Sequence, residues 1–103
     1  MEMYKENYMS LGEFIREVYM SEEGGKMTMQ QIADACGVTQ ATISRLINNK
    51  SDLTIEMAFK LEKGLGRSAQ SWMNLWVNYK IWEYKQKRVN GKMTRGYFRK
   101  NIQ

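Results

Sequence analysis

Apolar residues recur at intervals of three or four along almost the whole chain, which is the period of an α-helix. In the first such stretch, residues 10–20, this spacing predicts that Phe14, Ile15 and Val18 face a core. The sequence contains no proline, the residue that most strongly interrupts a helix. The pattern therefore predicts an all-α fold.

Capping residues divide this pattern into five predicted helices. Two of them begin with a capping box, in which side chains three residues apart each accept a hydrogen bond from the other's backbone N–H group. The boxes are Ser10 with Glu13 and Thr28 with Gln31; the other N-caps are Thr39, Thr54 and Ser68, and the terminating glycines are Gly37 and Gly66. These signals predict helices over about residues 10–20, 28–37, 39–48, 54–65 and 68–84, the last ending at Tyr84 or slightly beyond it.

The fifth predicted helix is the longest, and its apolar residues lie on more than one face. Trp72 and Trp76 share a face that we expect to enter the core, although an aromatic stripe also suits an interface. One core does not cover the remaining faces, so this helix is expected to carry a surface for a second copy or another partner. The candidate residues are Met73, Val77, Tyr79, Ile81 and Trp82.

Composition and length indicate an ordinary globular protein. The 103 residues are enough for one domain, and 43% of them are hydrophobic and 26% charged. The sequence has neither an apolar stretch long enough to span a membrane nor the apolar region of a signal peptide. These features predict a cytoplasmic protein with no membrane partner.

The residue types on which most enzymes depend are absent or isolated. There is no histidine, the commonest general base and metal ligand. The single cysteine, Cys36, has no partner for a disulfide or a metal site, and we expect it to be buried. No glycine-rich phosphate loop is present. The sequence therefore predicts a protein that is not an enzyme and that holds no cofactor and no metal.

Positive charge is concentrated at the C-terminal end. The net charge is +5, yet residues 85–103 contain seven basic residues and no acidic one, which leaves residues 1–84 slightly acidic. We therefore divide the chain into a domain of residues 1–84 and a basic tail of residues 85–103. The tail contains Asn90–Gly91, a turn signal, and is expected either to form a small hairpin or to be disordered. A basic segment suits a polyanionic partner.

Residues 29–48, MQQIADACGVTQATISRLIN, have the pattern of a helix-turn-helix. Ala33 is small enough for a helix crossing, and Gly37 tolerates the positive φ of a tight turn. Ile43 and Leu46 are apolar positions behind the second helix. An αα-hairpin with no role in nucleic-acid binding has a similar pattern. The residues on the outward face of the second helix therefore decide between the two interpretations.

That outward face suits the major groove of DNA. Its side chains are short or form hydrogen bonds, and none is acidic; the predicted base-reading residues are Thr39, Gln40, Ala41, Thr42, Ser44 and Arg45. Glutamine and arginine match the edges of adenine and guanine, and a methyl group matches that of thymine. Phosphate contacts are predicted for Thr28, Gln30, Asn48, Asn49 and Lys50.

The segment resembles the helix-turn-helix of phage-repressor-like (XRE, or Cro/C1-type) regulators. More narrowly, residues 53–58, Leu65–Gly66 and the run from Ser71 to Trp82 resemble the HigA/VapI antitoxins, and the likeness covers about residues 10–84. The resemblance implies a five-helix, phage-repressor-like domain that forms a homodimer and binds an inverted-repeat operator in double-stranded DNA at its own promoter. It also implies a partner, a HigB-like toxin that cleaves mRNA.

Other functions fit parts of the sequence. A solitary XRE-family regulator from a phage or mobile element would have the same helix-turn-helix and no toxin, and the basic tail matches no motif of the antitoxins. An interaction module that has lost DNA binding would carry acidic or bulky residues at Gln40, Thr42 and Arg45, and this sequence does not. The sequence therefore favours a DNA-binding repressor, with the antitoxin role as the preferred interpretation.

Overall fold

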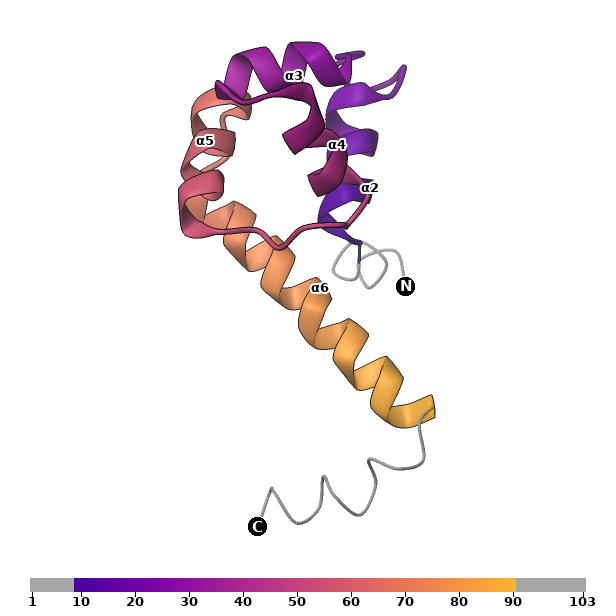
Figure 1. Cartoon of the computed structure of the whole chain (residues 1–103). Coiled ribbons are helices and arrows are strands. Elements are labelled where there is room, and N and C mark those ends of the chain that lie inside the picture. Colours follow the sequence, from indigo (N-terminus) through magenta and orange to yellow (C-terminus); the bar gives the residue numbers. More distant parts are fainter. Residues whose placement is uncertain (1–8, 91–103) are drawn as a thin grey trace.

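The computed structural model of the protein describes residues 9–90, and the side chains of residues 9–87. This part of the chain is all-α and contains no strand, which confirms the predicted fold class (Figure 1). The elements are α2 (Leu11–Ile15), which continues as the π-helix η1 (Arg16–Met20), then α3 (Met29–Cys36), α4 (Gln40–Ile47), α5 (Ile55–Leu65) and α6 (Ala69–Asn90). None of these helices is long and apolar enough to cross a membrane.

The predicted caps are present at the starts of the helices. Ser10 Oγ accepts a hydrogen bond from the backbone N–H of Glu13, and Glu13 Oε1 accepts one from the backbone N–H of Ser10, at 3.1 and 3.0 Å. Thr28 and Gln31 form the same reciprocal pair. Each such cap satisfies donors that the helix itself leaves unpaired, and is typically worth about 1 kcal/mol.

Positive-φ residues end α3, α4 and α5. Gly37 and Gly66 have φ of +72° and +96°, as predicted for glycines after a helix. The sequence did not predict the same role for Asn49, which has φ of +58°. The N–H of Lys50 donates to the carbonyl of Arg45 at 2.8 Å, so α4 ends in a Schellman-type turn with asparagine in place of glycine.

The π-helix changes which side of the first helical segment faces the core. Val18, predicted to be buried, is 40% exposed, so this prediction was wrong. A π-turn is wider than an α-turn, and it shifts the phase of the residues after Ile15 so that Tyr19 faces inward instead. The ring of Tyr19 lies 6.0 Å from that of Trp72, and its hydroxyl donates to the carbonyl oxygen of Leu65 at 3.4 Å.

A single core fills the space between the helices, with Trp72 fully buried among the rings of Phe14 and Tyr19. The prediction that Cys36 is buried is confirmed, whereas Trp76 is only half-buried at the edge of the core. The core residues are Leu11, Phe14, Ile15, Ile32, Ala33, Cys36, Ile43, Leu46, Ile47, Leu53, Ala58, Leu61, Ala69 and Trp72.

Two glycines allow pairs of helices to touch through their backbones. A Cβ atom added to Gly12 in α2 would lie 1.8 Å from the carbonyl oxygen of Ile47 in α4. One added to Gly64 in α5 would lie 2.5 Å from Cys36 Sγ in α3. Both helices of the predicted helix-turn-helix are therefore held against the domain where no side chain fits.

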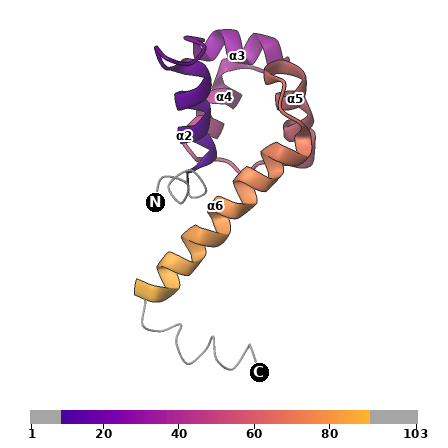
Figure 2. The ribbon, with the colours of Figure 1, turned by 180° about the vertical axis from the view of Figure 1, so that it is seen from behind.

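Helix α6 leaves the other helices and projects away from them (Figures 1 and 2). Its first turns pack against α5 and α2. The helix reaches Asn90, so residues 85–90 of the predicted tail continue α6 rather than leave it. The turn predicted at Asn90–Gly91 and the remainder of the tail lie outside the described residues.

Candidate nucleic-acid interface

Helix α4 is buried along one side and exposed along the other. Ile43, Leu46 and Ile47 are 0%, 3% and 0% exposed, and they attach the helix to the core. Gln40, Ala41, Arg45 and Asn48 are exposed, while Thr42 and Ser44 are half-buried at the margins. The sequence prediction of which residues of α4 face outward agrees with this arrangement.

The polar side chains on the outer face of α4 differ in how firmly they are held. The hydroxyl of Thr39 accepts the N–H of Thr42 at 3.2 Å and lies 2.9 Å from that residue's hydroxyl, so this pair caps the helix. Within the described residues, the side chains of Gln40 and Arg45 make no hydrogen bond or ion pair. These two side chains are therefore the ones free to bind a ligand outside the protein.

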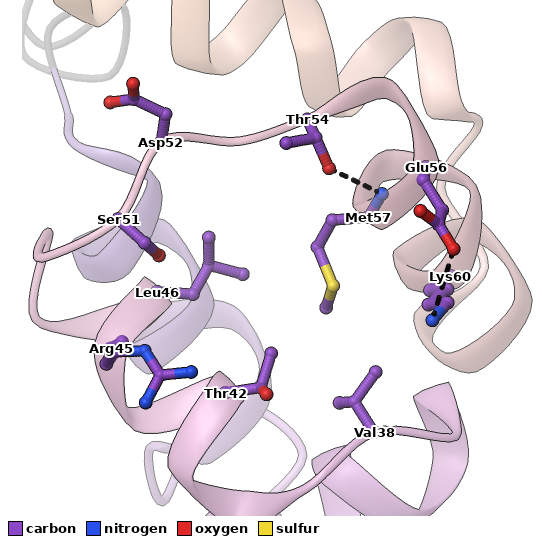
Figure 3. Close-up of a pocket in the computed structure, with 10 residues that line it drawn as sticks. All are labelled: Val38, Thr42, Arg45, Leu46, Ser51, Asp52, Thr54, Glu56, Met57 and Lys60. Atoms are coloured by element: carbon purple, nitrogen blue, oxygen red, sulfur yellow. Dashed lines mark hydrogen bonds and ion pairs between the residues drawn. The ribbon is translucent and has the colours of Figure 1, made fainter.

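A hollow of about 280 Å³ lies beside Arg45, between α4 and the start of α5 (Figure 3). Thr42 and Arg45 project from one wall, while Glu56 and Lys60 form an ion pair of 3.6 Å on the other. Asp52 also lines the hollow, so its charges are mixed and it does not form an anion pocket. The hollow leaves the guanidinium of Arg45 room to change direction.

The residues predicted to contact phosphate lie at two places. Thr28 and Gln30 are at the start of α3, where the Thr28 hydroxyl caps the helix and the Gln30 amide donates to Asp34 Oδ1 at 2.9 Å. The second group, Asn48 to Lys50, follows α4. Asn49 forms the positive-φ turn, and its amide also lies 3.5 Å from Ser10 Oγ, so its side chain has a structural partner within the domain.

Arg16 is a polar residue at this surface that the sequence analysis missed. Its Nη2 donates to Asn48 Oδ1 at 2.7 Å, across 32 positions of sequence. A pattern of local spacing contains no sign of such a contact. Only the packing of α2 against the end of α4 brings the two side chains together.

The predicted partner surface on α6 divides into inward and outward residues. Met73 packs against the core. Tyr79 lies 5.6 Å from the ring of Trp82 and lines a hollow of about 150 Å³ beside the α4–α5 loop. Burial, together with the carboxylates of Glu83 and Glu13, raises the pKa of Tyr79. Val77 and Ile81, 38% and 49% exposed, form the outward part.

Tyr84, 54% exposed, extends the outward part of α6. Three lysines, Lys80, Lys85 and Lys87, occur along the same part of the helix, and the first is paired with Glu83 at 3.0 Å. The projecting part of α6 therefore combines apolar residues with a mainly positive charge.

Residues 9–87 contain no group of three histidine, cysteine or carboxylate side chains placed to hold a metal ion. Burial raises the pKa of the Cys36 thiol, which disfavours the reactive thiolate. The described residues form a helix-turn-helix, α3 and α4, whose second helix exposes side chains that can form hydrogen bonds.

Comparisons with known proteins agree with this class. The helix-turn-helix family matches residues 23–72, which include α3, α4 and α5. An uncharacterized HTH-type transcriptional regulator of Haemophilus influenzae is 31% identical over 74 residues, covering 72% of this chain and 67% of that protein. Antitoxin HigA-1 of Vibrio cholerae is 32% identical over 79 residues, covering 77% of this chain and 72% of that protein.

A solved structure of a hypothetical protein from E. coli has the same fold. It superimposes with a TM-score of 0.67 at 29% identity, covering 84% of this chain and 87% of that chain. This chain therefore belongs to the helix-turn-helix family of DNA-binding transcriptional regulators. Its resemblance to HigA-type antitoxins, predicted from the sequence, is confirmed by the match to HigA-1.

Proposed function

We propose that this protein is a sequence-specific repressor that places α4 in the major groove of its operator. The observation that carries this proposal is the pair Gln40 and Arg45, exposed on a helix whose opposite side is buried and without partners in the described residues. Both are residue types that form two hydrogen bonds with a single base. Ala41 and the methyl group of Thr42 supply apolar contacts on the same face.

The remaining polar residues of the unit would fix its position on the DNA backbone. The first turn of α3, with Thr28 and Gln30, has a helix N-terminus that favours a phosphate. We expect Asn48 and Lys50, which are exposed after the other end of α4, to contact the backbone there. Phosphate contacts supply affinity but no sequence preference, so discrimination depends on α4.

The working unit in this proposal is a homodimer that binds an inverted repeat. One recognition helix reads only a few base pairs, and helix-turn-helix dimers bind half-sites about one turn of DNA apart. A two-fold interface uses the same patch from both copies. Val77 and Ile81 on the projecting part of α6 provide an exposed apolar patch that the domain's own core leaves uncovered.

The finer proposal is that the repressor is an antitoxin acting in the cytoplasm, which controls its own operon and neutralises an mRNA-cleaving, HigB-like toxin. Its support is the likeness to HigA-1 over 72% of that protein's length. A projecting α6 with surface beyond the core also suits a protein that binds a second macromolecule besides DNA.

Binding to the DNA upstream of the protein's own gene tests the repressor proposal. We expect footprinting to show protection of an inverted repeat, and expression of the protein to lower transcription from that promoter. A scrambled duplex of the same length is the control. Equal affinity for both duplexes would contradict the proposal.

Co-expression with the adjacent short open reading frame tests the antitoxin proposal. We expect that reading frame alone to arrest growth, and this protein to restore it through a complex that co-purifies. If the neighbouring product is harmless while operator binding persists, the protein is a solitary regulator of the same family.

A further inference from the structure

Arg16 lies directly over the C-terminal end of α4 because of the way α2 and α4 touch. The backbone N–H of Arg16 donates to the carbonyl oxygen of Gly12, so the two residues are one α-helical turn apart and share one face of the first helical segment. At Gly12 that face meets the backbone of Ile47 with no room for a Cβ atom. Arg16 is therefore the next residue on the face that contacts α4, and its hydrogen bond to Asn48 is the result.

The hydrogen bond from Arg16 leaves most of its donors unused. A guanidinium has five N–H donors. One nitrogen, Nη2, donates to Asn48, and the acceptor is a neutral amide oxygen. In the described part of the chain no carboxylate forms an ion pair with Arg16, whose side chain is exposed. The positive charge therefore remains available at the surface beside α4.

The surroundings of Arg16 extend the end of the recognition helix. The amide of Asn48 in turn lies 3.4 Å from Ser44 Oγ, so Arg16, Asn48 and Ser44 form a polar chain along the edge of α4. Lys50, two residues beyond Asn48, is a second exposed cation. Arg16 is also the first residue of η1, and π-turns occur frequently at functional sites.

Resting on the proposed function, we infer that Arg16 binds a phosphate of the DNA backbone beside the C-terminal end of α4. Asn48 orients the guanidinium, and the remaining N–H donors form charge-assisted hydrogen bonds with the phosphate oxygens. The first helical segment thus supplies a cation to a surface that the sequence pattern assigned only to residues 28–50.

The test compares Arg16→Gln, which keeps a hydrogen-bond donor and removes the charge, with Arg16→Lys, which keeps the charge. Affinity for a scrambled duplex and for the upstream duplex is measured over a range of salt concentrations. Lys63→Gln, which removes an exposed cation from α5, is the matched control for net charge. Urea unfolding checks that each variant is folded.

We expect Arg16→Gln to make the slope of log K against log salt shallower by about 0.9 on both duplexes, which corresponds to about 3.5-fold in affinity over a fourfold change in salt. Arg16→Lys and Lys63→Gln should retain the wild-type slope. An unchanged slope for Arg16→Gln would overturn the inference, as would an effect confined to the upstream duplex. Failure of the proposed function would give a different result: the wild-type protein itself would bind the two duplexes with equal affinity.

Discussion

At the scale of single residues, the position of the recognition helix depends on a glycine that contacts no DNA in the proposed complex. Gly12 allows the backbone of α2 to approach the carbonyl of Ile47, and Arg16 follows on the same face. A neighbouring backbone yields less readily than a flexible side chain. Any side chain at position 12 must therefore separate α2 from α4.

We expect Gly12→Ala to lower the free energy of unfolding by about 1–3 kcal/mol, the usual cost of overpacking. Urea denaturation measures this decrease. Gly37→Asn is the matched control, because a Cβ at Gly37 meets nothing within 4 Å and asparagine tolerates positive φ. Equal decreases for the two variants would show that the contact between α2 and α4 is looser than described.

Tyr19 makes the stability depend on pH in the alkaline range. Burial raises the pKa of its hydroxyl above the ordinary value of 10.0, and Arg67 partly opposes the rise. The folded protein therefore holds this proton to higher pH than the unfolded chain. The contribution is fully present below about pH 10 and is lost as the pH rises through the folded-state pKa.

Tyr19→Phe removes this titration and also the hydrogen bond to the carbonyl of Leu65. We expect the variant to be less stable than wild type at pH 8, and the difference to shrink as the pH rises above 10. Urea unfolding of both proteins between pH 8 and 11 measures the difference between their free energies of unfolding. The lysines titrate in both proteins, so their effect cancels in that difference. Parallel stability curves would mean that Tyr19 is not buried as described.

Side chains on the recognition unit were predictable from sequence to different degrees. The buried and exposed sides of α4 follow from helical period, so Ile43 and Arg45 were placed correctly. Arg16 was not found, because a contact across 32 positions depends on how two helices pack. Asn49 was interpreted as a phosphate ligand, and its positive φ became visible only in the structure.

At the scale of elements, helix boundaries were predictable because the caps are local. A Ser, Thr or Gly at a helix end acts through backbone groups within a few residues, so Ser10, Thr28 and Gly37 could be recognised without tertiary structure. The π-helix was not predictable, since the sequence from Arg16 to Met20 carries no comparable signal. The phase shift that it causes explains why Val18, which was predicted to be buried, is exposed and why Tyr19 packs against Trp72.

The basic end of α6 yields a prediction about salt. Removal of residues 85–103 deletes seven positive charges, and residues 85–90 of the deleted segment belong to α6. We expect the truncated protein to bind the upstream duplex more weakly, with a slope of log K against log salt shallower by roughly 0.9 for each phosphate that the deleted segment neutralises. An identical slope would exclude a role in DNA binding and leave the segment for a protein partner.

At the scale of the whole molecule, a small domain carries a helix that extends well past it (Figure 2). The fold class and the helix-turn-helix were predictable from sequence, whereas the direction of α6 and its division into inward and outward residues were not. Tyr79 and Val77 have similar spacing patterns, yet only Val77 is exposed. That difference depends on where α6 crosses α5 and α2.

Replacing Val77 and Ile81 together by glutamate tests the proposed dimer. We expect the wild-type protein to sediment as a dimer at micromolar concentration, and the variant to be monomeric and to protect only half of the inverted repeat. Ile55→Glu, which places a charge at a 61% exposed position of α5, is the control and should remain dimeric. If the variant is monomeric and still binds the full operator with undiminished affinity, operator binding does not depend on the dimer, and this surface serves another partner.

The most direct test of the central claim is the ratio of affinities for the upstream and scrambled duplexes, measured for Gln40→Ala and Arg45→Ala. Each variant should lose about 1–3 kcal/mol of discrimination while it unfolds at the wild-type urea midpoint, because both side chains lie outside the core. Gln70→Ala on α6 should keep the wild-type ratio. A ratio unchanged in both α4 variants would show that α4 does not read the DNA sequence.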